Sequence, residues 1–203
     1  MKALIVRTGV ANVASIAAAL RRCGLDPEIT ADPGAVRESE IVILPGVGSF
    51  GAGMGALRRS GLDDALIDRI NTGRATLAVC LGLQLFASES EETPGVRGLG
   101  VIDANIARFP RDVRTPQFGW NRVETDSDPI LGESGYAYYA NSYRLTEVPP
   151  GWNAAWSEHG GRFVGALRRG PVVACQFHPE LSGKWGLGLI RRWVASAKEM
   201  PSC

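Results

Sequence analysis

Short aliphatic runs alternate with helix-period segments through the first half of the chain. The runs that are apolar at successive positions are residues 3–6, 41–44 and 75–79. Two segments show helical spacing of apolar residues: 13–22, which closes at Gly24, and 62–70, which ends before Gly73. Strands that are apolar on both faces and separated by helices are typical of a parallel sheet covered on both sides. This pattern predicts an α/β core.

The second half of the chain has a different sequence pattern, in which short segments with strand propensity are separated by turn residues. These pieces are residues 137–139, 162–167 and 172–177, and Gly170-Pro171 predicts a hairpin turn between the last two. A closing helix is predicted over 186–198. A chain of 203 residues fits one domain. We therefore expect a single α/β domain, 1–203, with a central, mostly parallel sheet flanked by helices and an additional β-rich part in the second half.

Composition argues against a nucleic-acid or membrane partner. The chain has 22 lysines and arginines and 21 aspartates and glutamates, a net charge of +1, so no broad electrostatic field would attract polyanions. No run approaches the roughly 20 apolar residues of a membrane span. The four cysteines form no CxxC pair, and Cys23, Cys175 and Cys203 are interpreted as structural or terminal residues. We expect a soluble, cytoplasmic protein.

Cys80 lies between the run 75–79 and a predicted helix, 81–86. Small residues at Ala78 and Gly82 allow the sharp strand-to-helix turn of a nucleophile elbow, which presents a side chain above the edge of a sheet. The helix start would favour the thiolate through its dipole and its free N–H groups. Taken alone, a cysteine after a core strand is more often a small buried apolar residue. A nucleophile also needs a base.

The chain contains two histidines. His159 lies in a glycine-flanked turn and is interpreted as a solvated loop residue. His178 follows a predicted strand, and Pro179 keeps it out of helical geometry. In an extended segment residues two apart point the same way, so Glu180 would orient the His178 ring while the ring accepts the Cys80 proton. Taken alone, His178 would more often be a histidine at a strand end that is hydrogen-bonded to solvent. Together with a cysteine in a strand-to-helix turn, it predicts a catalytic triad.

A glycine-rich loop, 45–51, follows the second aliphatic run and precedes a predicted helix. Such a loop leaves backbone N–H groups free to meet an oxyanion, and the N–H of Leu81 would assist beside Cys80. The loop matches neither the dinucleotide-binding nor the phosphate-binding fingerprint. By itself a glycine-rich turn after a strand is usually just a turn. Together with the triad it predicts an oxyanion hole.

These three motifs resemble those of class I glutamine amidotransferases. They read PGVG (45–48), CLGLQ (80–84) and FHPE (177–180). Longer stretches narrow the resemblance to the glutaminase subunits of imidazole glycerol phosphate synthase. They are PGVGSFGAGM (45–54), PQFGWN (116–121) and QFHPELSG (176–183). The resemblance covers nearly the whole chain, and the combination of motifs is specific.

The resemblance implies hydrolysis of glutamine through a cysteine thioester, which releases ammonia and then glutamate. Cys80 would be the nucleophile, His178 the acid and base, and Glu180 the partner that orients His178. The residues implied to form the oxyanion hole are Gly46, Val47, Gly48 and Leu81. The residues implied to hold glutamine are Gln84, Asn141, Ser142 and Tyr143. No metal and no cofactor are expected.

In this family the ammonia passes to a (β/α)₈-barrel cyclase subunit, which makes imidazole glycerol phosphate and aminoimidazole carboxamide ribotide in histidine biosynthesis. The resemblance therefore implies a heterodimer, with weak glutaminase activity until the partner holds its ligand. The positions that depart from the family pattern are the loop 7–12, Ala78, Asn141 and Leu181. None of them belongs to the triad, but the loop and Leu181 fall where the family contacts its partner.

Two other functions remain open at this point. The chain could be another ammonia-donating enzyme, or a hydrolase, with the same fold. The PQFGWN and PGVGSFG stretches argue against this. It could also be a silent subunit that only binds and regulates a partner, because fold alone does not imply activity. The intact Cys80, His178 and Glu180 argue against silence. A glutaminase assay with the cyclase partner discriminates between these possibilities.

Overall fold

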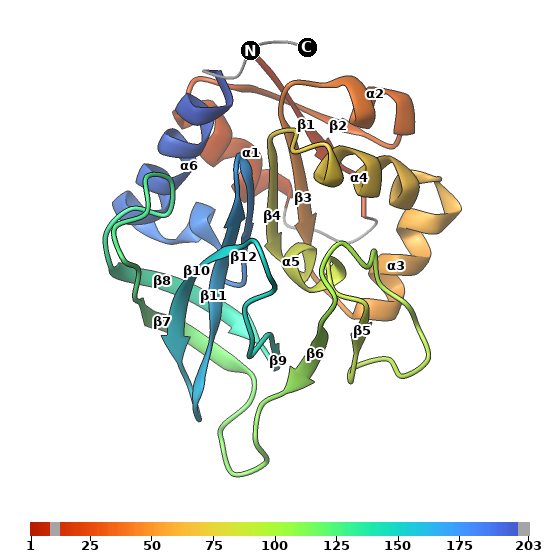
Figure 1. The fold of residues 1–203 in the computed structure, drawn as a ribbon. Helices are drawn as coiled ribbons and strands as arrows, with labels where there is room; N and C mark the ends of the chain where they lie inside the picture. The colour runs from red at the N-terminus through yellow and green to blue at the C-terminus, as the bar shows by residue number, and fades with distance from the viewer. Residues whose placement is uncertain (9–12, 199–203) are drawn as a thin grey trace.

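The computed structural model describes residues 1–8 and 13–198, and a seven-stranded sheet runs through its centre (Figure 1). The strands of this sheet are β1 (Lys2–Val6), β2 (Asp26–Thr30), β3 (Val42–Gly46), β4 (Thr76–Cys80), β10 (Asn153–Glu158), β11 (Arg162–Arg169) and β12 (Val172–Cys175). They lie in the order β10-β11-β12-β4-β3-β1-β2. The strands from β12 to β2 are parallel, and β11 and β10 continue the sheet in antiparallel fashion. The prediction of a mostly parallel sheet is confirmed.

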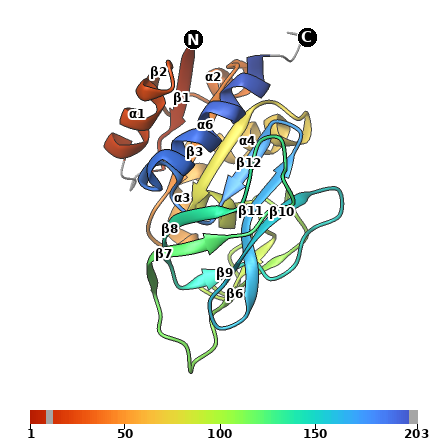
Figure 2. The same ribbon diagram turned by 90° about the vertical axis from the view of Figure 1, so that its left-hand side faces the viewer.

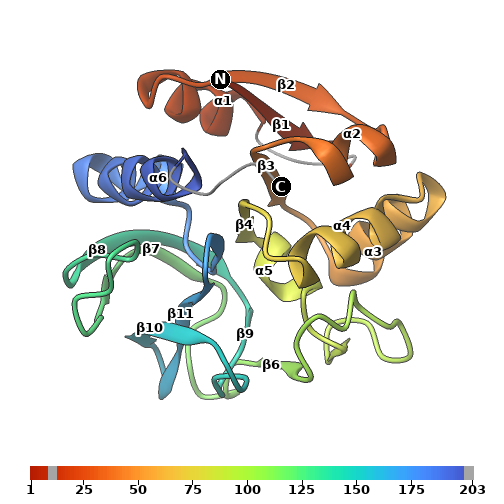
Figure 3. The ribbon, with the colours of Figure 1, turned by 45° about the horizontal axis from the view of Figure 1, so that its top comes forward.

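Helices cover both faces of this sheet, as Figure 3 shows. One face carries α1 (Val13–Arg22) and α6 (Gly183–Lys198); the other carries α2 (Pro33–Glu38), α3 (Phe50–Arg59), α4 (Leu62–Asn71) and α5 (Leu81–Leu85). Successive strand residues point to opposite faces, so Ile5 packs with Leu20 and Trp193 in one core, whereas Leu44 packs with Leu57 in the other. This arrangement explains strands that are apolar at every position. No helix in the described ranges is long and apolar enough to cross a membrane.

The β-rich second half packs against the end of the sheet where the parallel strands stop. Its strands outside the central sheet are β5 (Glu89–Ser90), β6 (Asn105–Arg108), β7 (Gln117–Val123), β8 (Gly135–Asn141) and β9 (Tyr143–Arg144). β7 and β8 form an antiparallel hairpin that lies beside β10 and β11 (Figure 2). The N–H of His178, just beyond β12, donates to the Tyr138 carbonyl of β8 at 2.8 Å. The hairpin is therefore tied to the edge of the sheet where Cys80 lies.

Several element boundaries differ from the predicted ones. β3 continues through Pro45 and Gly46, where the sequence predicted a stop, because β4 pairs with it along its whole length. β12 ends at Cys175 instead of reaching residue 177. α6 begins three residues earlier than predicted, at Gly183, because Gly183 and Gly186 in its first turn are poor helix formers that hide the start of the helix in the sequence. β2 was not predicted, since this edge strand has no fully buried residue.

A buried arginine holds the opposite end of the sheet together. The Arg69 side chain, in a residue only 1% exposed, donates hydrogen bonds of 2.6–3.0 Å to backbone carbonyls at the end of α2 and just before β3 and β4. Burial and the neighbouring Arg74 lower its pKa to about 9, which leaves it charged at neutral pH. These bonds satisfy carbonyls that a helix end leaves without partners. The amino ends of β3 and β4 are thus fixed relative to each other.

The close approach of α5 to β3 generates a stability prediction. A Cβ at Gly82 would overlap the carbonyl oxygen of Leu44, so Gly82→Ala should lower the free energy of unfolding by about 1–3 kcal/mol. The control is Gly55→Ala in α3, where a Cβ meets only the mobile guanidinium of Arg59 at 3.3 Å. This change should be neutral or stabilising by up to about 1 kcal/mol, because alanine favours helix. Urea unfolding followed by circular dichroism measures both; equal losses would contradict the close approach.

Candidate active site

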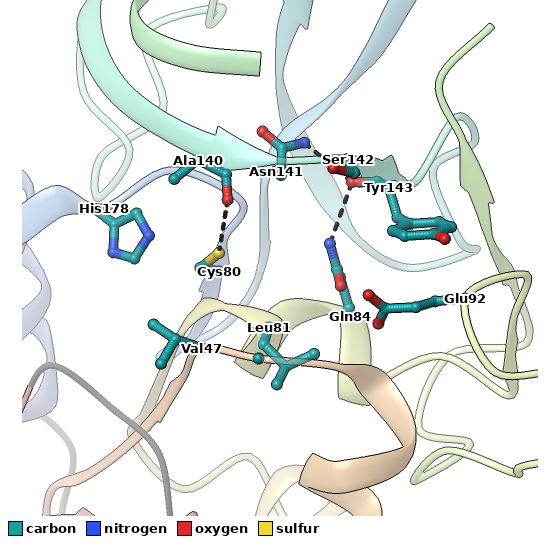
Figure 4. Close-up of a pocket in the computed structure, with 11 residues that line it drawn as sticks. Val47, Cys80, Leu81, Gln84, Glu92, Ala140, Asn141, Ser142, Tyr143 and His178 are labelled. Atoms are coloured by element: carbon teal, nitrogen blue, oxygen red, sulfur yellow. Dashed lines mark hydrogen bonds between the residues drawn. The ribbon is translucent and has the colours of Figure 1, made fainter. Parts of the chain in front are cut away.

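Cys80 is the last residue of β4 and directly precedes α5, in the sharp turn that the sequence predicted. Its backbone has φ 54° and ψ −109°, a conformation that residues other than glycine rarely adopt. Such strain persists where the surrounding structure imposes it, often at functional sites. The Sγ atom faces the Ala140 carbonyl of β8 at 3.9 Å (Figure 4). It also accepts from Gln176 Nε2 at 3.9 Å. The turn thus places the thiol between the sheet and the hairpin.

A pocket of about 250 Å³ opens beside this thiol (Figure 4). It is lined by Val47, Gly48, Cys80, Leu81, Gln84, Glu92, Ala140, Asn141, Ser142, Tyr143 and His178. The structure therefore gathers the predicted nucleophile, the histidine, part of the glycine-rich loop and the predicted glutamine-binding residues around one space. Pockets that hold drug-sized ligands measure roughly 300–1,000 Å³. The smaller volume suits a substrate of amino-acid size.

Two of the predicted residues, Gly46 and Glu180, lie behind the wall of this pocket, beside a smaller cavity. Gly46 ends β3 and pairs with Cys80 in the register of β3 and β4. A Cβ on Gly46 would lie 2.7 Å from Cβ of Leu81. Glycine at position 46 therefore allows the loop to pass close to the start of α5, next to the nucleophile.

The His178 ring is oriented by Glu180. Its Nδ1 lies 2.9 Å from Glu180 Oε1, and the two side chains are only 9% and 4% exposed. The predicted contact forms, but the predicted geometry was wrong: Glu180 lies in a 3₁₀ turn, η1 (Pro179–Leu181), and not in an extended segment. The turn that Pro179 starts brings the carboxylate back toward the ring. The second ring nitrogen, Nε2, is left to interact with Cys80.

Charges around His178 favour its protonated form. Burial lowers the pKa of His178, but hydrogen bonds and charge interactions with Cys80 and Glu180 outweigh burial and raise the pKa from 6.5 to about 10. A buried opposite charge stabilises a cation strongly, because little water screens the pair. A protonated imidazole beside the pocket can donate a proton to a leaving group there.

The remaining described cysteines and His159 lie outside the pocket. Burial raises the pKa of Cys23, and burial together with Glu180 raises that of the fully buried Cys175, so both thiols stay neutral. Cys203 lies outside the described residues. His159 is half-buried rather than fully solvated, because its Nε2 lies 2.8 Å from the Arg114 carbonyl and its ring packs edge-on against Phe109. Its contacts join two loops.

Sequence reasoning missed three groups at the site. Glu92 lines the pocket, and its Oε2 accepts from the N–H of Phe50 at 2.6 Å, at the start of α3. The Ala140 carbonyl and the Gln176 amide both face the Cys80 sulfur. Glu92 sits in an acidic stretch, 89–92, that is typical of a solvated loop. Backbone carbonyls carry no sequence signal, and Gln176, although it begins the recognised stretch 176–183, was given no role.

The positions that depart from the family pattern can now be located. Asn141 lines the pocket and donates from Nδ2 to the Tyr143 carbonyl at 3.0 Å. Leu181 is 38% exposed beside Glu180. Ala78 is buried in β4, where its methyl group is accommodated. In the altered loop 7–12, positions 9–12 lie outside the described residues.

Comparisons with known proteins agree with this geometry. The family profile described as Glutamine amidotransferase class-I matches residues 4–193. The chain is 38% identical over 194 residues to "Imidazole glycerol phosphate synthase subunit HisH" of Symbiobacterium thermophilum, covering 94% of this chain and 92% of the relative. It is 39% identical over 193 residues to "Imidazole glycerol phosphate synthase hisHF, chloroplastic" of Arabidopsis thaliana, covering 92% of this chain and 33% of that protein.

The fold also matches that of solved structures. One described as "Crystal structure of glutamine amidotransferase" superposes with a TM-score of 0.77 over 97% of this chain and 98% of the other. Its sequence identity of 22% limits the comparison to the fold. The layered sheet and the β-rich second half are therefore an arrangement that a distant amidotransferase shares.

The His178 and Glu180 contact predicts a change in titration. Glu180→Gln keeps the shape of the side chain but removes its charge, so the pKa of His178 should fall below its value of about 10 and the ring should lose its proton at lower pH. The imidazole resonances followed by NMR measure this midpoint, and His159→Asn assigns them. Glu158→Gln, an equivalent change on the surface, is the control. An unaltered midpoint in Glu180→Gln would show that the carboxylate does not charge the ring.

Proposed function

Because the chain belongs to the class I glutamine amidotransferase family, and within it to the glutaminase subunits of imidazole glycerol phosphate synthase, we propose that it releases ammonia from glutamine through a Cys80 thioester and supplies a cyclase in histidine biosynthesis. The observation that carries the proposal is the placement of Cys80 and the buried His178 and Glu180 pair on one pocket of amino-acid size. The two facing groups are a nucleophile and a proton carrier.

The first step forms the thioester. The Cys80 thiolate attacks the carboxamide carbon of glutamine, and a C–S bond forms as the carbonyl oxygen becomes negative. His178 then gives its proton to the leaving nitrogen, the C–N bond breaks and ammonia departs. Glu180 keeps the ring oriented and stabilises its charge through the 2.9 Å contact. Its role is therefore exerted through His178.

The second step returns the enzyme to its starting state. Water attacks the thioester carbon while His178 accepts a proton from that water, and the C–S bond breaks to release glutamate and the Cys80 sulfur. In both steps the negative oxygen would be met by the N–H of Leu81 and by N–H groups of Val47 and Gly48, which line the pocket. Removing one such donor typically costs about 10²–10³ in rate.

The rest of the pocket supplies groups for the backbone end of glutamine. Glu92 offers a carboxylate to the ammonium group. Gln84 uses its Nε2 hydrogens on the Tyr143 carbonyl and on Gln176, which leaves its Oε1 as a further acceptor. Ser142 offers a hydroxyl and an N–H to the carboxylate. This arrangement distinguishes a free amino acid from an internal peptide residue, which lacks both charges.

An exposed aromatic patch next to the pocket supports docking of a cyclase subunit. The patch, defined as Phe118, Trp120, Tyr136 and Tyr138, lies on one face of the β7–β8 hairpin, and its first three rings are 72%, 59% and 60% exposed. Clustered exposed rings mark protein-binding surfaces. The exposed Leu181 follows Glu180 directly. In the Arabidopsis relative the matched region is a third of the polypeptide named hisHF, and we propose a heterodimer with a (β/α)₈-barrel cyclase for this chain.

Separate ammonia production gives a test with two nitrogen sources. In a mixture with the cyclase and its ribonucleotide substrate, Cys80→Ala should abolish turnover with glutamine but leave turnover with ammonium salt nearly unchanged, because only the ammonia source is lost. Product formation measures both. Cys23→Ala is the matched control and should leave both rates intact. Glutamine-dependent turnover in Cys80→Ala, or its absence in the unaltered chain, would contradict the proposal.

Docking through the aromatic patch predicts a loss of affinity. Trp120→Asp places a charge at the centre of the patch and should raise the Kd for the cyclase about 30-fold or more, as loss of a central aromatic contact does. The control is Ile29→Asp on β2, at the far edge of the sheet, where the side chain is 47% exposed. Isothermal titration calorimetry measures both. A similar Kd for the two variants would place the interface elsewhere.

A further inference from the structure

Gln176 is a fully buried polar side chain beside the nucleophile. It follows β12, and the parallel register pairs Cys175 with Val79, so Gln176 leaves the sheet level with Cys80. The residue is 0% exposed, and a buried amide is costly unless its groups find partners. Its Oε1 accepts from Gln84 Nε2 at 3.0 Å, and its Nε2 lies 3.9 Å from the Cys80 sulfur.

The orientation of the Gln176 amide follows from a neighbouring group that can only accept hydrogen bonds. The backbone carbonyl of Tyr143 can only accept, so the group of Gln84 that lies 3.2 Å from it must be the NH₂ end. The same NH₂ group meets Gln176, which therefore presents its oxygen to Gln84. The NH₂ end of Gln176 is left facing Cys80. A row of amides thus runs from a backbone carbonyl to the sulfur and ends in a donor.

Besides the His178 ring, which interacts with the sulfur through a hydrogen bond and through charge, two neighbours of the sulfur favour different protonation states. The Ala140 carbonyl accepts from the neutral thiol and gives no stabilisation to a thiolate. The Gln176 N–H donates, and a donor stabilises a negative acceptor more than a neutral one. Because both contacts lie at 3.9 Å and the surroundings are buried, the donor also restricts where the sulfur can lie after it loses its proton.

We propose that Gln176 is a positioning residue, whose Nε2–H holds the Cys80 sulfur and favours the thiolate, with an orientation imposed through Gln84. The inference rests on the proposed role of Cys80 as nucleophile. It extends the site beyond the triad to a side chain that has no direct contact with the pocket. It also gives Gln84 two tasks, since the residue that lines the glutamine pocket orients the donor to the sulfur as well.

The test is the pH profile of alkylation of Cys80 by iodoacetamide in the intact chain, followed on the Cys80 peptide by mass spectrometry. Gln176→Leu removes the donor and should move the midpoint up by about one pH unit, which is about a tenfold lower rate at pH values well below the midpoint. Gln176→Glu replaces the donor with a like charge and should move it further. Gln117→Leu, an equivalent change at another buried amide, should leave the profile in place. An unmoved profile in a folded Gln176 variant would overturn the inference.

A second measurement uses the unaltered chain and so does not depend on how the variants fold. In an ¹⁵N-labelled sample the side-chain NH₂ resonances of Gln176 should shift with the same pH midpoint as Cys80 alkylation, and this shift should be absent in Cys80→Ser. If the chemical shifts of the Gln176 NH₂ group did not change with the ionisation of Cys80, the proposed contact would be overturned. The alkylation profile needs no glutamine, so a chain without glutaminase activity would contradict the proposed function while still testing Gln176.

Discussion

The parallel hydrogen-bonded ladder that joins β3, β4 and β12 is the constraint on which the site depends. Carboxyl ends of parallel strands meet at one edge of a sheet, and the register sets Gly46 opposite Cys80 and Gln176 level with it. Segments far apart in sequence thereby deliver the loop, the nucleophile and the donor to one place. At the opposite end of the sheet, where these strands begin, Arg69 holds the starts of β3 and β4 together. A slip of one residue in this register would exchange the strand side chains that pack in the two cores and would separate the groups of the site.

Burial gives the polar groups of the site their strength and also their mutual dependence. Gln84, Gln176 and His178 are each less than 9% exposed, and each has partners within the site. In such surroundings charges are weakly screened, so Glu180 can hold His178 protonated far above its ordinary range. An unpaired buried polar group costs about 1–3 kcal/mol. The site is therefore a connected network in which the orientation of one amide decides that of the next.

Much of this arrangement could be predicted from the sequence, because aliphatic runs and glycines report directly on backbone geometry. The parallel sheet followed from strands apolar on both faces, and the elbow followed from Ala78, Cys80 and Gly82. The contact of His178 with Glu180 was predicted for the wrong reason, since only the structure reveals the 3₁₀ turn. Edge strands such as β2 lack a buried pattern. Glu92 and the Ala140 carbonyl owe their positions to loops and to a hairpin whose packing no local spacing encodes.

The exposed aromatic patch also affects how this chain behaves when no partner is bound to it. Rings as exposed as those of Phe118 and Trp120 are tolerable on a surface that is covered for most of its lifetime, but copies made in excess over the partner would keep them in water and tend to associate with one another. Under the proposed docking, therefore, production of this chain in balance with its partner would keep the rings of this hairpin out of water.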